Sequence, residues 1–230
     1  AQILEEHAFS AELTAAEVPA VAPLELHGAT LHHHAGFPFS VSPYRGGRPP
    51  ELDDFEVLEW IGRFLARIHT VGTKRPFETR PALDLQSFGI ASRDWLLGNE
   101  KIPLDVQRLW ETACKEALDM IGKTALATDA QGRLGSEFKS LRLHGDCHPG
   151  NILWTPTDRP GGGPHFVDLD DARTGFAVQD LWMLLSGDRA QRTGQLSGLL
   201  EGYEQFRSFD RRELALIEPL RTLRLIHYSA

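Results

Sequence analysis

Carboxylate and amide side chains gather in the stretch LRLHGDCHPGNILW, residues 141–154, between two apolar ends. Asp146 and Asn151 stand five positions apart within it, and Asp168 follows an apolar run seventeen residues after Asn151. Phosphoryl transfer from ATP needs these residue types, because a carboxylate must orient the acceptor hydroxyl and accept its proton while oxygen ligands hold Mg²⁺ against the phosphates. Asp146 is therefore the candidate catalytic base, and Asn151 and Asp168 are the candidate Mg²⁺ ligands.

The spacing D-x-x-x-x-N is common by itself, and its context makes it informative. His144 and Gly145 precede Asp146, Pro149 lies inside the stretch, and the later aspartate follows a turn. Together these residues match the kinase catalytic loop H-R-D-x-x-x-x-N, with Gly145 in place of the arginine. The alternative interpretation is a polar turn in a hairpin. A metal-dependent hydrolase fits poorly, because the histidine spacing does not provide a set of transition-metal ligands.

Hydrophobic periodicity predicts the helices that must position these side chains. Apolar residues three and four apart favour helices over residues 2–16, 55–72 and 104–122. Three more helical segments are expected after residue 177. Asp210 with Glu213 predicts a variant of the capping box at the start of the last one.

Short strands are expected before the helix at residues 55–72 and after the helix at residues 104–122. Residues 24–43 show strand patterns with turns at Gly28 and Gly36. The histidines at 32–34 are expected on an edge strand and not at a metal site, because adjacent strand residues point to opposite faces. Further strand-like pieces lie at residues 141–144, 151–155 and 165–169. The Gly- and Pro-rich residues 44–54 mark a boundary between a small β-containing part and a larger helical part.

The composition predicts a globular protein, and we expect a cytoplasmic monomer. The chain has 230 residues, 41% of them hydrophobic, and its net charge of −8 comes without a Lys/Arg run, so we expect no nucleic-acid partner. No apolar run is long enough to span a bilayer, and no signal peptide opens the chain, so we expect no membrane partner. Two distant cysteines, Cys114 and Cys147, suit a reducing compartment better than a disulfide framework.

The stretch HGDCHPGN, followed by FVDLDDARTGFAVQDLW, resembles the aminoglycoside phosphotransferase and choline kinase superfamily. VDLDDARTGFAVQDLWMLLSGD and IEPLRTLRLIHY look most like its bacterial stress response kinase A branch, a group of serine/threonine protein kinases. The resemblance covers nearly the whole chain. It implies an α+β, protein-kinase-like, two-lobed fold. We expect residues 1–44 to form an incomplete N-lobe with the hinge, and residues 45–230 to form a mainly helical C-lobe.

The resemblance implies ATP and Mg²⁺ as cofactors and a protein Ser/Thr hydroxyl as the phosphate acceptor. A small-molecule kinase, acting on an alcohol such as an aminoglycoside, choline or homoserine, is the alternative. A nucleotide-binding module without turnover is a second alternative, because no glycine-rich phosphate loop and no strand lysine precede Glu6. In the superfamily those parts lie upstream of the position of residue 1. The intact Asp146, Asn151 and Asp168 favour an enzyme.

Further site residues follow from the resemblance. Asp180 in VQDLW resembles the buried aspartate that steadies the catalytic loop, and His144 is expected to be structural as well. Glu6 resembles the glutamate of the first helix that pairs with the ATP-binding lysine. Glu5 is the competing choice, because the register of the helix is not fixed by sequence.

The nucleotide contacts are also implied by resemblance. SVSPYRGG resembles the hinge between the lobes, so backbone groups around Ser42 and Tyr44 would face adenine, and Leu153 would lie beneath the ring. His148 occupies the place where protein kinases carry a lysine near the transferred phosphate. It would contact the γ-phosphate or make a hydrogen bond that stabilises the loop.

The chain departs from protein kinases after Asp168. Only eleven residues separate Asp168 from Asp180, and no A-P-E motif follows, so there is no room for a long activation loop. We therefore do not expect switching by loop phosphorylation. Asp170 and Asp171 could add to the metal site, although a solvated acidic turn is the simpler interpretation.

Overall fold

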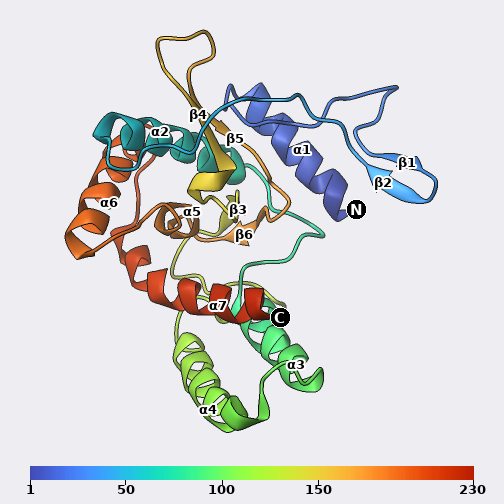
Figure 1. Cartoon of the computed structure of the whole chain (residues 1–230), viewed down its shortest axis with the longest axis vertical. Coiled ribbons are helices and arrows are strands. Elements are labelled where there is room, and N and C mark those ends of the chain that lie inside the picture. The colour runs from blue at the N-terminus through green and yellow to red at the C-terminus, as the bar shows by residue number, and fades with distance from the viewer.

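The first helix of the chain packs through one apolar face. The computed structural model describes all residues 1–230 and opens with α1 (Gln2–Ala15), in which Phe9 and Leu13 are fully buried. A small hairpin follows, with β1 (His32–His34) antiparallel to β2 (Phe37–Phe39). Its histidines are exposed or half-buried, as expected for an edge strand. Figure 1 shows α1 and this hairpin side by side at one end of the molecule.

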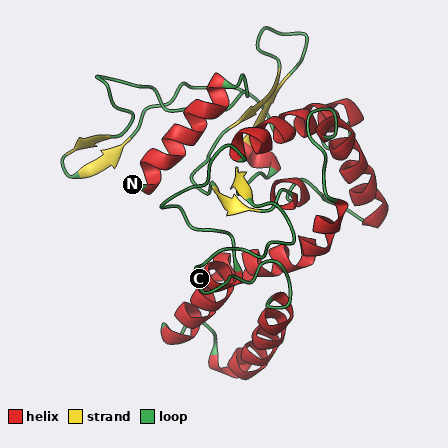
Figure 2. Ribbon diagram, turned by 180° about the vertical axis from the view of Figure 1, so that it is seen from behind, coloured by secondary structure: helices red, strands yellow, loops and turns green.

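The remainder of the chain is mainly helical, with short strands at its centre (Figure 2). Its helical elements are α2 (Phe55–Gly72), η1 (Leu85–Ile90), α3 (Ala91–Gly98), α4 (Leu104–Ile121), η2 (Pro149–Asn151), α5 (Val178–Trp182), α6 (Arg189–Tyr203), η3 (Arg211–Leu216) and α7 (Ile217–Ser229). Its strands form two antiparallel pairs, β3 (Leu141–Leu143) with β6 (Arg173–Gly175) and β4 (Ile152–Thr155) with β5 (Gly163–Phe166).

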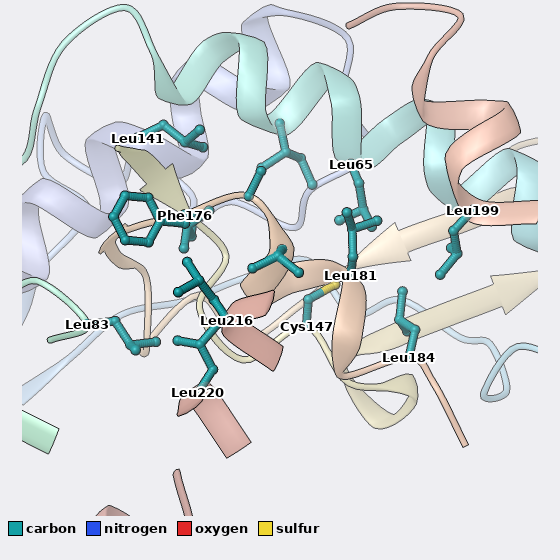
Figure 3. Packing of buried hydrophobic residues seen from close by; sticks show 14 of the residues in the cluster. Leu65, Leu83, Leu141, Cys147, Phe176, Leu181, Leu184, Leu199, Leu216 and Leu220 are labelled. Atoms are coloured by element: carbon teal, nitrogen blue, oxygen red, sulfur yellow. The ribbon is translucent and has the colours of Figure 1, made fainter. Parts of the chain in front are cut away.

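Helix α2 is the centre of the core. The Asp54 side chain accepts the backbone N–H of Glu56 at 2.9 Å and caps the helix. Ile61, Leu65 and Ile68 then follow at helical spacing with no exposed surface. Figure 3 shows Leu65 among apolar side chains of the C-lobe, with Leu181, Leu184 and Leu199 nearby. A continuous apolar core, which includes Leu143 and Ile152, therefore holds the candidate catalytic stretch, residues 141–154, in place.

The β4–β5 hairpin sets the position of the candidate metal ligands. Its register pairs Ile152 with Phe166, so the polar residues next to these positions emerge at the same end of the hairpin. The chain after α1 runs along β5, because Phe166 donates its N–H to the carbonyl of Pro19 and its own carbonyl accepts the N–H of Val21. This edge contact brings α1 toward the end of β5.

Most of the predicted elements are confirmed, with three corrections. The strand expected at 165–169 ends at Phe166. Helix α4 packs through Cys114, Leu118 and Ile121, and the apolar residues that suggested it, such as Met120, are exposed. Asp210 caps the last helical segment as predicted, because its side chain accepts the N–H of Arg212 at 3.0 Å. The reciprocal bond of the capping box is absent, because the Glu213 carboxylate turns inward to accept the N–H of Val178 at 2.9 Å.

The structure also contains elements that the periodicity did not indicate, namely η1, α3 and β6. Both cysteines are free and buried, and burial raises the pKa of the Cys147 thiol well above its usual range. None of the helices combines the length and apolar character that crossing a membrane requires.

Candidate active site

The residues from Asp146 to Asn151 form one tightly bonded loop. The backbone carbonyl of Asp146 accepts both the N–H of His148 at 2.9 Å and the Asn151 side-chain Nδ2–H at 3.0 Å. The N–H of Asn151 in turn bonds to the His148 carbonyl at 2.9 Å. Because Nδ2 is held in this way, Asn151 Oδ1 points elsewhere and makes no hydrogen bond within the protein. The loop thus presents a carboxylate and an amide oxygen on a rigid backbone.

Asp180 fixes the start of this loop from beneath. It is fully buried, and its two oxygens accept the backbone N–H groups of His144 and Gly145, each at 2.9 Å. His69 Nε2 lies 3.0 Å from the same carboxylate. Burial is the largest single influence and would raise the pKa of Asp180. The hydrogen bonds from His69 and from the Gly145 N–H, with the charge interactions of His69 and His144, together outweigh burial and lower the pKa. The predicted structural role of Asp180 matches this geometry.

Gly145 explains one departure from the kinase pattern. Its φ of +88° lies in the left-handed region, and a Cβ there would stand 2.0 Å from the backbone oxygen of Asp171. A side chain, arginine included, would therefore collide with the segment that follows Asp168.

Asp168 is joined to the catalytic loop through its neighbour. Val167 donates its N–H to the Asn151 carbonyl at 3.0 Å, and its own carbonyl accepts a hydrogen bond from His144 Nε2 at 3.0 Å. His144 is fully buried, and its burial and this hydrogen bond are consistent with the structural role expected for it. Asp168 itself has a φ of +61° and an exposed carboxylate with no partner in the protein. Hydrogen bonds thus join the segments that carry Asp146, Asn151 and Asp168.

The structure separates the two glutamates of α1. Glu5 turns to the loop after α2, where hydrogen bonds from the backbone of Glu78, Thr79 and Arg80 and from the Thr79 hydroxyl overcome burial and lower its pKa to about 2. Glu6 instead lines a cleft together with Ser42 and Asp168. Burial, with the charge of Asp170 nearby, raises the pKa of Glu6 to about 7. Glu6 is therefore the glutamate that faces the site.

Arg80 lines the same cleft, and sequence reasoning missed it. Its guanidinium donates to three carbonyls, those of Gln2 at 3.0 Å, Ala172 at 2.6 Å and Asp170. It therefore clamps the start of α1 to the segment that follows Asp168. No sequence signal marks it, because it lies in an irregular loop without periodicity.

Of the other residues predicted to contact the nucleotide, only Ser42 lines this cleft. Ser42 lines the cleft with Glu6, whereas Tyr44 is 95% exposed and Leu153 lies half-buried on β4, against Gly47. His148 makes the loop-stabilising bond, because its Nδ1 accepts the N–H of Gly150 at 2.9 Å. Its Nε2 remains free of hydrogen bonds and lies 3.5 Å from Asp146 Oδ2.

The two aspartates that follow Asp168, Asp170 and Asp171, have different surroundings. Asp171 pairs with Arg173 at 2.8 Å and accepts the Tyr228 hydroxyl at 3.1 Å, so it serves the structure. Asp170 is exposed and lines the cleft beside Asp168.

The donor set at Asn151 and Asp168 fits Mg²⁺. Both offer hard oxygen atoms without protein partners, which Mg²⁺ prefers to nitrogen or sulfur. No group of three or more His, Cys, Asp or Glu side chains in the structure could hold a metal ion. A Mg²⁺ ion at this place would therefore complete its shell with phosphate oxygens and water.

Comparison with known proteins agrees with this geometry. The sequence profile described as the phosphotransferase enzyme family matches residues 1–217. The chain belongs to this family. Stress response kinase A of Escherichia coli (strain K12) is 45% identical over 229 residues, which are 100% of this chain and 65% of that protein. The serine/threonine protein kinase RdoA of Salmonella typhimurium (strain LT2) is 43% identical over the same shares of both chains.

The chain thus spans 65% of the length of these curated relatives. Among solved structures, an amicoumacin kinase in complex with AMP-PNP, Ca2+ and Ami matches with a TM-score of 0.72 at 21% identity, covering 98% of this chain and 68% of that one. The expected α+β, protein-kinase-like fold is therefore confirmed, as is the resemblance to the superfamily and its stress response kinase A branch.

Proposed function

We propose that this protein is an ATP-dependent kinase, most simply a serine/threonine protein kinase of the stress response kinase A type. The observation that carries the proposal is the bonded arrangement of the segments that hold Asp146, Asn151 and Asp168, in which Asn151 bonds to the Asp146 carbonyl and Val167, next to Asp168, bonds to the Asn151 carbonyl. Membership of the phosphotransferase enzyme family and 45% identity to a named stress response kinase support it.

In the proposed reaction the acceptor oxygen bonds to the γ-phosphorus of ATP as the bond to the ADP oxygen breaks. Asp146 orients the acceptor hydroxyl and takes up its proton. Asn151 Oδ1 and the Asp168 carboxylate would hold Mg²⁺, which when bound neutralises negative charge on the phosphates. Asp180 keeps the backbone beneath Asp146 from moving, so the base stays in place during transfer.

ATP would occupy the cleft lined by Glu6, Ser42 and Asp168. The backbone around Ser42 and Tyr44 would face adenine, with Leu153 beneath the ring, and His148 Nε2 would be free to approach the γ-phosphate. Glu6 would receive the ATP-binding lysine of the family pattern. No lysine precedes Glu6 in this sequence.

The acceptor is proposed to be a protein Ser/Thr hydroxyl. The relatives at 43% to 45% identity are named as stress response or serine/threonine protein kinases. A small-molecule acceptor is the second candidate, favoured by the fold shared with the amicoumacin kinase. We also propose that the protein is a monomer and lies in the cytoplasm.

Labelled ATP separates these candidates. The full-length protein and its Asp146→Asn variant would be incubated with Mg²⁺ and γ-labelled ATP, alone, with a basic protein, and with a panel of small alcohols and amino alcohols. Label on protein that is absent in the variant supports the protein kinase. Label only on a small alcohol moves the assignment to a metabolite or drug kinase, and nucleotide binding without transfer refutes the proposed activity.

A further inference from the structure

The Asp146 carboxylate has a cationic neighbour from the far end of the chain. Arg224 of α7 places Nη1 2.6 Å from Asp146 Oδ1. The contact is one of charge, because Oδ1 is buried and no N–H points at it with hydrogen-bond geometry. The other oxygen, Oδ2, has only the weak 3.5 Å approach of His148 Nε2. Oδ2 is therefore the oxygen left for an acceptor hydroxyl.

Arg224 is itself held in place. Its guanidinium stacks on the Tyr228 ring, with 4.1 Å between the guanidinium carbon and the ring centroid. The Tyr228 hydroxyl donates to Asp171 Oδ2 at 3.1 Å, and Asp171 pairs with Arg173. Asp171 stands three residues after Asp168 in the same segment. One continuous set of contacts thus runs from the candidate base, through α7, to the segment of the candidate metal ligand.

The neighbouring arginine of α7 makes an ion pair of a different kind. Arg221, one turn earlier on α7, is exposed and pairs with Glu218 of its own helix at 2.8 Å, as surface arginines usually do. Arg224 is 26% exposed and Asp146 14% exposed, so the pair is partly shielded from water and its charge interaction is correspondingly stronger.

We propose that Arg224 is a positioning residue for phosphoryl transfer, which holds Asp146 through Oδ1 so that Oδ2 meets the acceptor hydroxyl. This inference rests on the proposed kinase activity. In the reaction the acceptor proton passes to Asp146, and Arg224 stays protonated throughout, since guanidinium groups do not titrate in proteins.

The test compares variants of the full-length protein with Mg²⁺, ATP and the acceptor identified by the labelling experiment. Arg224→Gln is expected to lower kcat roughly tenfold to a hundredfold, because a misplaced base loses part of the rate acceleration that general base catalysis supplies. The KM for ATP should change less than about twofold, because Arg224 does not contact the nucleotide cleft. Arg224→Lys should keep intermediate activity, because a single ammonium can still approach Oδ1. Added guanidinium at low millimolar concentration should restore part of the activity of Arg224→Ala. Arg221→Gln is the matched control and should behave as wild type.

Thermal unfolding and Mg–ADP binding of each variant show whether it is folded, and the Lys variant carries the test if Gln or Ala does not fold. A kcat of Arg224→Gln equal to or above that of wild type overturns the proposal. So does a loss that neither lysine nor guanidinium relieves, because that pattern indicates a structural role. Failure of the wild type to transfer phosphate to any acceptor refutes the proposed function instead.

Discussion

Two aspartates near the candidate site, Asp146 and Asp180, differ in what surrounds them. Asp180 is fully buried and satisfied by donors from His69, His144 and Gly145, so it has no free oxygen for substrate. Asp146 keeps one oxygen without a close donor and some exposed surface. At the residue scale, burial and the number of hydrogen-bond donors thus distinguish the structural carboxylate of Asp180 from the candidate catalytic carboxylate of Asp146.

Replacing Asp180 by alanine is expected to destabilise the protein by about 3–5 kcal/mol, because two buried backbone N–H groups and His69 lose their acceptor. Asp180→Asn keeps one oxygen and should cost less. Urea unfolding followed by fluorescence measures both. A loss below about 1 kcal/mol for the alanine variant would mean that the loop backbone is held by other contacts.

At the scale of elements, α2 and α6 touch through glycines. A Cβ on Gly202 would stand 2.0 Å from the backbone oxygen of Glu59, so Gly202→Ala is expected to push the helices apart and cost about 2–3 kcal/mol. Gly194 lies on the same helix with nothing within 4 Å of such a Cβ. Gly194→Ala should therefore be neutral or gain about 0.5–1 kcal/mol from helix propensity. Denaturant unfolding of both variants tests the packing, and equal effects would contradict it.

The junction of η3 with α5 is expected to be pH-sensitive. Burial raises the pKa of Glu213 from 4.5 to about 7, so the folded state retains a proton that the unfolded state has lost. Stability linked to Glu213 is therefore fully present below pH 4.5 and is lost as the pH rises to about 7.

Glu213→Gln keeps an oxygen for the N–H of Val178 but cannot titrate. Between pH 4.5 and 7 wild type should lose about 1–3 kcal/mol more stability than this variant. Unfolding free energies measured at several pH values test this, and parallel pH curves for the two proteins would contradict it.

At the scale of the whole molecule, Arg80 connects the two parts of the chain. It bonds the carbonyl of Gln2 in α1 and the carbonyls of Asp170 and Ala172 after the candidate metal ligand. Arg80→Gln should loosen this segment and raise the Mg²⁺ concentration needed for half-maximal transfer by roughly threefold to tenfold, since the loss is of one or two hydrogen bonds. Titrating Mg²⁺ at fixed ATP tests this. An unchanged Mg²⁺ requirement would show that Asp168 is positioned without the clamp.

The catalytic loop was predictable from the sequence because its residues are close together in the chain. Asp146 and Asn151 lie on one loop and Asp168 lies just beyond a strand end, and their spacing together with His144, Gly145 and Pro149 suggested one site. Glu6 could not be separated from Glu5, because the choice depends on the direction in which α1 faces. Arg80 and Arg224 were missed because each reaches the site from a distant segment, and a single arginine leaves no periodic signal.

The most direct test of the account concerns Asp146 alone. Single-turnover transfer of phosphate from Mg–ATP would be measured for wild type, Asp146→Asn and the control Asp158→Asn, whose exposed carboxylate lies in the β4–β5 loop. We predict that Asp146→Asn binds Mg–ATP as wild type does and transfers phosphate roughly 10²- to 10⁴-fold more slowly. The control should match wild type. Undiminished transfer by Asp146→Asn would contradict the account.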